Sequence, residues 1–342
     1  MMFFSIVVPY HNAEVNLREC ICSVCDQTHN EWELLLVNDA STDNSMHICN
    51  EFKQALGNKI HLLSCRAEGP LIARRVGYAK AQGDVIISLD SDDMLRYDAL
   101  DILEAAFEQS GADMVIFNCS RKKDFSGPNP LDPFPFDMFF SANEKLQCIR
   151  KLCSSYALNS MCIKAVRRKH IDVEADYSQW TGLKYAEDLL QSMPIMESVN
   201  SIYFIQERLY YYRVNYSGST KKFDSIQLEM RDAVNAVQQN YALRWQIEFD
   251  DDTLIDRVLA LGLSSYGDMA QGACEEMRYL HAAQFMQNLV DRGQFSVYWS
   301  SRRLSDLRMD MRFLVMMLKK RHFRVIWIFS RFKRALRKHL GR

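Results

Sequence analysis

The chain has 342 residues, which is enough for one or two domains with a large core. Its 48% hydrophobic and 25% charged residues are ordinary for a soluble globular protein, so its composition excludes a disordered or fibrous chain. The net charge of −1 hides an asymmetry. Residues 301–342 hold 14 of the 42 basic side chains but only 2 of the 43 acidic ones. Residues 1–300 therefore hold 28 basic and 41 acidic side chains. We therefore expect the two parts to have different electrostatic partners.

The first 120 residues alternate strand and helix signals. Near-continuous apolar strands that alternate with helices are typical of a mostly parallel sheet covered on both faces. The pattern predicts strands over 3–8, 32–38, 60–64, 84–89 and 113–118, and helices over 13–26, 42–54, 70–81 and 97–109.

The ten cysteines show no repeating disulfide framework, and the start of the chain has no secretory signal. Cys20, Cys22 and Cys25 lie close together and could suggest a metal site. They fall on a predicted helix, however, and no matching pair follows downstream. We therefore interpret them as small apolar side chains in a reduced core, and we expect the compartment to be the cytosol.

Residues 121–142 break the alternation, because four prolines and five phenylalanines are interleaved there. The segment is either a flexible loop that faces a substrate or a loop pinned to the body by its aromatic rings. Further on, the pattern predicts helices over 143–155 and 183–197, short strands over 201–205 and 208–213, and mostly helix from about 224 to 295.

The tail from about residue 302 mixes apolar and cationic side chains. The apolar runs 313–318 and 325–329 are separated by Lys319-Lys320-Arg321 and followed by further cations. Neither run approaches the roughly 20 residues that span a bilayer. This mixture suits a helix that lies in an anionic membrane surface. A nucleic-acid-binding tail, or a basic helix docked on the acidic body, is the alternative. Nucleic acid receives little support, since no recognition module accompanies the charge.

An apolar run from Val85 to Leu89 ends in Asp90-Ser91-Asp92-Asp93. Unpaired buried charge is very costly, so these carboxylates must lie where the strand emerges from the sheet. In open α/β sheets that edge is where ligands bind. Clustered carboxylates suit Mg²⁺ or Mn²⁺, which most often hold phosphates. The sequence therefore predicts a metal-assisted nucleotide site, with Asp93 either in the site or capping the next helix.

Three other segments can join this site. Asp39 follows a predicted strand, where it can accept a hydrogen bond from a base N–H or cap the next helix. Arg74 can neutralise the acidic cluster or reach a diphosphate. Glu187 and Asp188 stand at the head of an apolar helix, where they could also simply complement the helix dipole.

In order and spacing, these segments resemble the motifs of the family 2 inverting glycosyltransferases. The resemblance covers about residues 3–222 and leaves out the C-terminal third. Each motif alone is weak evidence for the family, whereas the whole set in this order and spacing is specific to it. The matching segments are Pro9-Tyr10-His11-Asn12, Gln27-Thr28, residues 33–43, residues 73–77, residues 89–93 and Glu187-Asp188.

The resemblance implies the nucleotide-diphospho-sugar transferase fold called GT-A, a Rossmann-like, mostly parallel α/β sheet flanked by helices. It would occupy residues 1–222, with a nucleotide-sugar-binding half over 1–120 and an acceptor half over 121–222. A mainly helical extension would follow over 223–300, and the basic amphipathic tail over 301–342.

The resemblance also implies roles for single residues. The edge formed by Pro9, Tyr10, His11 and Asn12 would lie beside the base, and Asp39 would bind the uracil. Asp90 would lie near the ribose, next to Ser91, and Arg74 would also face the donor. Asp92, helped by Asp90, would hold a Mn²⁺ or Mg²⁺ ion that bridges the donor phosphates. Asp188 would be the general base.

The implied activity is metal-dependent, inverting transfer of a hexose or N-acetylhexosamine from a UDP-sugar to a glycan or glycolipid acceptor. The tail suggests that the acceptor is a growing lipopolysaccharide core, O-antigen or capsule. The enzyme would then lie peripherally on the cytoplasmic face of the inner membrane, bound through residues 302–342. The alternative is a non-catalytic module that binds a nucleotide sugar.

Three positions depart from the family pattern. His11 stands where the family usually has Tyr, and Arg75 replaces the usual Asn. Many relatives carry a His after the segment that corresponds to Tyr210–Arg213, whereas this chain continues with residues 214–219 and has none there. No histidine ligand is therefore assigned, and Arg213 and Ser219 are candidates to face the diphosphate.

Overall fold

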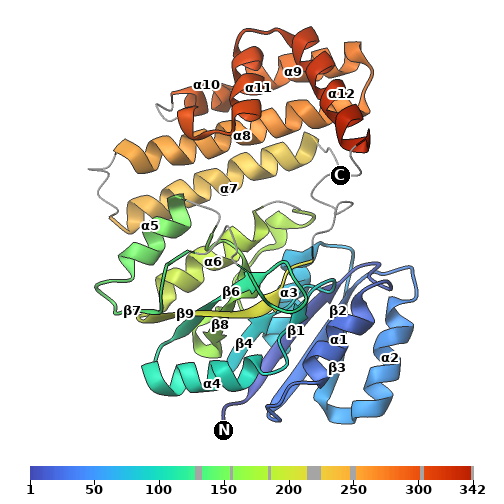
Figure 1. Ribbon diagram of the computed structural model, residues 1–342, viewed down its shortest axis with the longest axis vertical. Helices are drawn as coiled ribbons and strands as arrows, with labels where there is room; N and C mark the ends of the chain where they lie inside the picture. Colours follow the sequence, from blue (N-terminus) through green and yellow to red (C-terminus); the bar gives the residue numbers. More distant parts are fainter. Residues whose placement is uncertain are drawn as a thin grey trace. The chain divides into compact units, whose positions relative to one another are not determined.

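The computed structural model describes residues 1–127, 133–154, 157–183, 186–213, 225–246, 252–300 and 304–339. The chain divides into two units, Met1–Tyr216 and Ser217–Arg342. The first unit combines one sheet with helices, and the described part of the second is helical (Figure 1).

The sheet of the first unit is mixed but mostly parallel on its N-terminal side. Strands β3, β2, β1 and β4 are neighbours in that order and all run parallel. Beyond them β8 is antiparallel to both β4 and β6, and β6 runs parallel to β9. The two short strands β5 and β7 are each antiparallel to β9. The strands are β1 Phe4–Tyr10, β2 Trp32–Asp39, β3 Ile60–Cys65, β4 Val85–Ser88, β5 Met94–Leu95, β6 Met114–Ser120, β7 Met138–Phe140, β8 Lys164–Arg167 and β9 Ile202–Tyr211.

The helices of this unit fill the connections between the strands. Connections β1–β2 and β2–β3 run one way across the sheet, and β3–β4 returns past β1. Right-handed crossovers therefore place α3 on the face opposite to α1 and α2. The strands and helices predicted in residues 1–120 are present, with ends shifted by up to four residues. The helices are α1 Leu17–Cys25, α2 Ser45–Leu56, α3 Pro70–Lys80, α4 Ala99–Ser110, α5 Leu146–Ser154 and α6 Glu187–Ser198.

The prediction of two strands over 201–205 and 208–213 is wrong, because these residues form the single strand β9. Gln206 and Glu207 lie between the two predicted strands. In the structure they lie at a bulge, where the register moves from the Ile116–Phe204 pair to the Asn118–Arg208 pair. Strands β5, β7 and β8 were not predicted, since two to four residues carry too little pattern.

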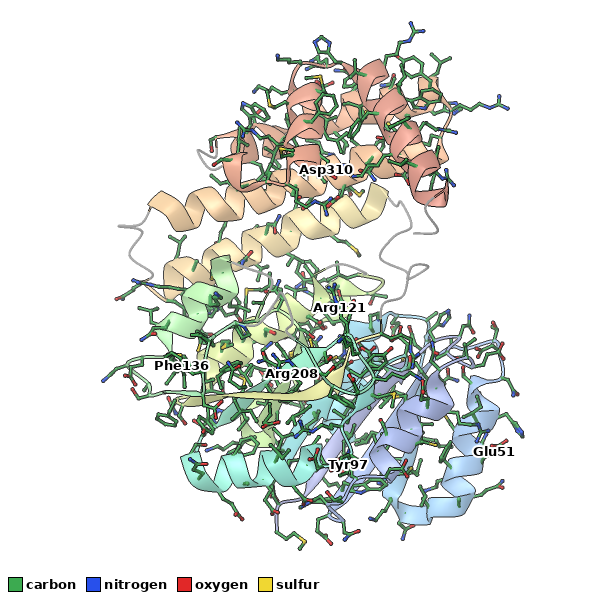
Figure 2. All side chains as sticks on the ribbon, in the orientation of Figure 1. Glu51, Tyr97, Arg121, Phe136, Arg208 and Asp310 are labelled. Carbon is green, nitrogen blue, oxygen red and sulfur yellow. The ribbon has the colours of Figure 1, made fainter. Side chains whose placement is uncertain are left out.

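The aromatic segment within 121–142 is pinned to the sheet over its described part. Strand β7 pairs with β9, and the ring of Phe134 packs against Phe140 at 5.0 Å and Phe204 at 5.2 Å between centroids. Phe136 remains 60% exposed (Figure 2). Of the two interpretations of this segment, the described residues support the pinned loop. Residues 128–132 lie outside the described residues.

All ten cysteines are free thiols. Cys20 is fully buried on the inner face of α1, whereas Cys22 and Cys25 are half-buried. The expected reduced state therefore agrees with the structure. Cys20 also contacts the predicted site, because its thiol donates to the Asp90 carbonyl at 3.5 Å.

The second unit is built around the long helix α8. Its core includes Tyr266, whose ring packs against Phe295 at 5.5 Å and Tyr298 at 5.7 Å. The predicted basic tail folds as α11 and α12, which pack against α8 and α9. Of the described helices, none has both the length and the apolar character needed to cross a bilayer. The helices are α7 Ser225–Arg244, α8 Asp252–Glu276, α9 Tyr279–Asp291, α10 Gly293–Trp299, α11 Met309–Lys319 and α12 Phe323–His339.

Gly77 lets α3 approach the sheet closely, and we predict that Gly77→Ala destabilises the protein. A Cβ there would lie 2.3 Å from Val7 Cγ1 and 3.3 Å from Val37 Cγ2, so the helix must shift. Overpacking of this kind costs about 1–3 kcal/mol, which urea unfolding measures. Gly293→Ala is the matched control, since a Cβ at Gly293 would meet nothing within 4 Å. Equal stability of both variants and the wild type would contradict the prediction.

Candidate active site

The order of the strands identifies the edge at which a ligand binds. Strand β1 lies between β2 and β4, and the direction of the crossovers reverses there. Ligands of open α/β sheets bind in the crevice at such a switch point, beyond the carboxyl ends of the strands. Residues 9–12 end β1 and follow it, Asp39 ends β2, and residues 90–93 follow β4. The fold therefore brings three of the predicted segments to one edge.

Arg74 connects this edge to the predicted base. Its side chain is 2% exposed, and α3 places it between two carboxylates. One guanidinium nitrogen donates to Asp90 Oδ1 at 2.6 Å, and the other donates to Asp188 Oδ1 at 2.7 Å. Burying an arginine is tolerable when both ends of its fork are paired in this way. Of the two roles predicted for Arg74, neutralising the acidic cluster is the one observed.

Asp188 lies in the first turn of α6, beside Glu187. Burial raises the pKa of the Asp188 carboxyl, and the charge of Arg74 opposes that rise. Burial, followed by the charge of Asp188, raises the pKa of Glu187 to about 8. A desolvated carboxylate beside a cation is suited to accept a proton, so a general-base role for Asp188 stays a prediction. The two acids also lie at the favourable end of the helix dipole, as the alternative interpretation expects.

Asp93 is a buried anchor and does not cap a helix. The residue at the N-cap of α4 is Asp98, whereas Asp93 is 2% exposed. Its carboxylate accepts from the Tyr210 hydroxyl at 2.6 Å and from the Arg213 backbone N–H at 2.7 Å. Burial, followed by the charge of Asp90, raises the pKa of Asp93 to about 8. Asp93 therefore ties the end of β9 to the acidic turn.

Arg213 reinforces this connection. Its Nε donates to the Asp92 carbonyl at 2.6 Å, and its guanidinium also pairs with Glu19 of α1. Glu19 pairs with Lys123 as well. The predicted candidate Arg213 thus lies directly beside the acidic turn. The other candidate, Ser219, lies outside the described residues.

Asp39 ends β2 and is 7% exposed. Its Oδ1 accepts from the backbone N–H of Glu68 at 2.7 Å, and its Oδ2 accepts from that of Gly69 at 2.9 Å. The Cys65 thiol also donates to Oδ1 at 3.2 Å, and burial raises the pKa of that thiol to about 12, so it stays protonated. Asp39 therefore fixes the loop that leads into α3, and its remaining lone pairs can accept from a ligand.

The four residues predicted to lie beside the nucleotide base, Pro9 to Asn12, form two pairs that differ in exposure. Pro9 and Tyr10 are buried, and the Tyr10 hydroxyl faces Cys49, so both serve the core. His11 and Asn12 are exposed. His11 Nδ1 donates to the Asp39 carbonyl at 2.6 Å, and Asn12 Oδ1 accepts from the Thr42 N–H at 2.8 Å. Only His11 and Asn12 of this group present side chains at the surface.

Asp90, Ser91 and Asp92 are partly exposed at the end of β4. Arg74 already occupies one oxygen of Asp90. No third carboxylate, His or Cys of the described chain converges with Asp90 and Asp92 closely enough to complete an all-protein cation site. Mg²⁺ is commonly held by one or two carboxylates together with substrate phosphates. The donor set therefore fits a hard cation that binds along with a phosphorylated ligand.

Lys164 is a site residue that the sequence analysis missed. It lies on β8, is 1% exposed, and donates from Nζ to the Leu158 carbonyl at 2.5 Å and to the Ser160 carbonyl. Burial lowers the pKa of Lys164 to about 8, and the charge of Asp188 opposes that shift. The segment that Lys164 holds leads to Met161, whose N–H donates to Asp188. A single lysine in a four-residue strand gives no signal in the sequence.

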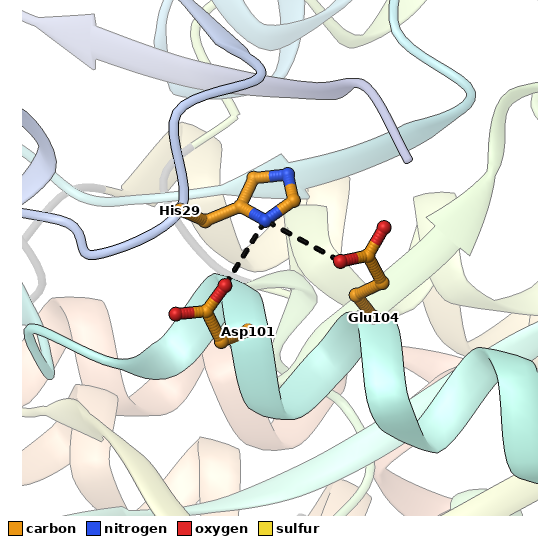
Figure 3. Close-up of side chains that lie close together, drawn as sticks. All are labelled: His29, Asp101 and Glu104. Carbon is orange, nitrogen blue, oxygen red and sulfur yellow. Dashed lines mark hydrogen bonds and ion pairs between the residues drawn. The ribbon is translucent and has the colours of Figure 1, made fainter. Parts of the chain in front are cut away.

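A second polar cluster lies at the opposite end of the strands (Figure 3). His29 Nδ1 is 3.1 Å from Asp101 Oδ1 and 3.6 Å from Glu104 Oε2. These carboxylates already have donors, because the Thr28 hydroxyl reaches Asp101 and the Met2 N–H reaches Glu104 at 2.5 Å. His29 Nε2 is 2.8 Å from the Met2 carbonyl. The cluster therefore fastens the start of β1 to α4.

The chain is similar in sequence to known glycosyltransferases. Residues 5–173 match the model described as glycosyl transferase family 2. Poly(ribitol-phosphate) beta-N-acetylglucosaminyltransferase TarS of Staphylococcus aureus is 26% identical over 220 residues, which cover 64% of this chain and 36% of TarS. The match thus spans about a third of that relative. The putative teichuronic acid biosynthesis glycosyltransferase TuaG of Bacillus subtilis is 28% identical over 224 residues, which cover 64% of this chain and 82% of TuaG.

The fold is also shared with a solved structure. The crystal structure of S. aureus TarS 1–349 in complex with UDP-GlcNAc matches with a TM-score of 0.64 at 19% identity, and the match covers 98% of this chain and 92% of that one. This likeness confirms the predicted GT-A architecture, including the helical C-terminal region. The sequence match and the fold together show that the chain belongs to glycosyl transferase family 2.

Proposed function

We propose that the chain is a metal-dependent, inverting glycosyltransferase that uses a UDP-sugar. The donor would carry a hexose or an N-acetylhexosamine, and the acceptor would be a hydroxyl of a growing bacterial glycan. The observation that carries the proposal is the Arg74 bridge, which holds the acidic end of β4 and the carboxylate of Asp188 in one site. UDP-GlcNAc is the first donor to test, because it is the ligand named for the TarS structure.

In the proposed reaction, each residue of the site has a separate role. Asp188 takes the proton of the acceptor hydroxyl as that oxygen attacks the anomeric carbon. Attack from the face opposite to the departing UDP inverts the configuration. His11, Asn12 and Asp39 form the edge beside the base, and Asp39 accepts from the uracil N–H. A hydrolase of the inverting kind needs a second carboxylic acid to protonate its leaving group, whereas a UDP leaving group does not.

A bound Mn²⁺ or Mg²⁺ would supply positive charge to the departing diphosphate. Asp92 would hold it, assisted by the Asp90 oxygen that Arg74 leaves open. Arg74 holds Asp90 in place and also pairs with Asp188, so it serves the metal side and the base side of the site together.

The acceptor is proposed to be a cell-surface glycopolymer, such as lipopolysaccharide, O-antigen or capsule. The relatives support a glycopolymer, since they include proteins named for teichuronic acid and O-antigen biosynthesis. The enzyme would act peripherally at the cytoplasmic face of the membrane. The rival function is a nucleotide-sugar-binding module without catalysis, and the pairing of Asp188 with Arg74 favours the enzyme.

Asp188→Asn should abolish transfer while leaving UDP binding intact. Loss of a general base lowers kcat by roughly 10²–10⁴-fold. In the wild type, the rate should fall as the pH drops through the raised pKa of Asp188, because the protonated carboxyl cannot accept a proton. UDP release and calorimetric UDP binding measure the two effects, with the exposed Asp26→Asn as control. Full activity of Asp188→Asn would refute the assignment, and no transfer by the wild type with any UDP-sugar would favour the binding module.

Asp92→Asn should weaken the metal dependence specifically. We expect the concentration of Mn²⁺ needed for half-maximal UDP release to rise at least about tenfold, since one of two carboxylate ligands is lost. Chelation by EDTA should stop the wild-type reaction, and added Mn²⁺ should restore it. Asp98→Asn, a change of the same kind just before α4, is the control. Wild-type activity that persists in EDTA would overturn the metal proposal.

Arg74→Lys should impair both stability and catalysis. A compact ammonium cannot reproduce the two-pronged contact with Asp90 and Asp188, and a lost buried charged contact costs about 1–3 kcal/mol. Because the single ammonium cannot contact Asp90 and Asp188 at once as the guanidinium does, the positive charge is held less closely to Asp188, whose pKa should rise further, and the acid limb of the pH–rate profile moves to higher pH. Urea unfolding and the pH profile measure these effects. Arg18→Lys, at an exposed pair with Glu51, should change neither.

A further inference from the structure

Helix α12 has two apolar faces, and only one of them is buried. On the inner face, Ile326 and Ser330 are fully buried against the core of the second unit. The outer face carries an exposed stripe with spacings of three, four and four residues, which keeps it on one side of the helix. The stripe consists of Val325, Ile328, Phe332 and Leu336, which are 43%, 56%, 66% and 48% exposed.

Helix α11 extends this stripe. Met309 and Met316 are two turns apart on one face, and they are 89% and 36% exposed. Phe313 lies between them on that face, and its ring packs against Phe329 of α12 at 4.9 Å. We call the exposed residues of both helices the tail ridge: Met309, Met316, Val325, Ile328, Phe332 and Leu336. An exposed apolar surface of this kind on two adjacent helices is typical of an interaction site.

The charges around the tail ridge are almost all positive. Arg324 precedes Ile328 by one turn of α12 and is exposed, whereas Arg321, in the turn before α12, is exposed and pairs with Asp291 of α9. Lys320 and Arg312 are exposed on α11 or just after it. Residues 301–342 contain only two acids, and one of these, Asp310, is paired with Lys333 and Arg308. The ridge is therefore apolar along its centre and cationic on its flanks.

We propose that the tail ridge docks on an anionic lipid bilayer, with α12 lying in the plane of the surface. The apolar side chains would enter the boundary between headgroups and acyl chains, and the arginines would stay with the headgroups. A nucleic acid is held mainly through its phosphates, which an apolar centre cannot contact favourably. A second copy of the chain, docked through the same ridge, would bring its cations against these cations. The inference rests on the membrane location in the proposed function and names the surface responsible for it.

Flotation of the full chain with vesicles tests this proposal. Binding is expected to phosphatidylcholine vesicles that contain phosphatidylglycerol, to be much weaker without phosphatidylglycerol, and to fall as salt is raised. The double variant Ile328→Ser/Phe332→Ser removes two exposed side chains and should lower the bound fraction at least about tenfold. Leu243→Ser/Val297→Ser is the matched control, since these residues are 64% and 48% exposed on α7 and α10.

Three results would overturn the proposal. They are unchanged binding by the ridge variant, equal binding to vesicles without phosphatidylglycerol, and a wild-type oligomer in solution that the ridge variant converts to a monomer. The last result would assign the ridge to a second copy. UDP release from UDP-GlcNAc is measured in the same samples. A chain that binds vesicles but releases no UDP contradicts the proposed function and leaves this inference standing.

Discussion

The buried guanidinium of Arg74 is the constraint on which the site depends. A cation that is 2% exposed must have both ends of its fork paired, and here the partners Asp90 and Asp188 come from distant parts of the first unit's sequence. Asp90 follows β4 and Asp188 begins α6, so the bridge fixes α6 against the edge of the sheet. The bridge also requires α3 to lie close to β1, which is why position 77 has no room for a Cβ.

The same bridge opposes the effect of burial on the carboxyl groups of the site. Burial favours neutral carboxyls, as the raised pKa values of Asp93 and Glu187 show. A general base and a metal ligand must nevertheless be ionised. Arg74 supplies the opposing charge to Asp90 and Asp188, while Asp93 is satisfied by the Tyr210 hydroxyl and a backbone N–H. Neighbouring acids in one turn therefore have partners of different kinds, a guanidinium for Asp90 and a hydroxyl with a backbone N–H for Asp93.

The sequence could predict the residues that face the site but not the contacts that hold them. Parallel strands that end in polar residues place Asp39 and Asp90 at one edge, and this follows from periodicity alone. The contact between Arg74 and Asp188 joins residues 114 positions apart, so no local pattern reveals it. Tyr10 shows a different limit, because its place in a motif predicts a position beside the base, whereas its side chain is buried with the hydroxyl toward Cys49 of α2. Lys164 and the bulge in β9 were missed because short strands and local irregularities depend on tertiary pairing.

The C-terminal helices show why composition alone could not resolve the tail. A mixture of apolar and basic residues is equally compatible with a helix folded into a core and with one lying on a membrane. In the structure α12 does the first with one face, and several of its cations serve that purpose: Arg331 and Arg334 donate to the carbonyls that end α8. Such cations complement the negative end of a helix dipole. What remains outside is a narrower set, the tail ridge with the exposed cations Arg312, Lys320 and Arg324. We therefore assign the surface function to this set, because the cations that donate to the end of α8 already serve the fold.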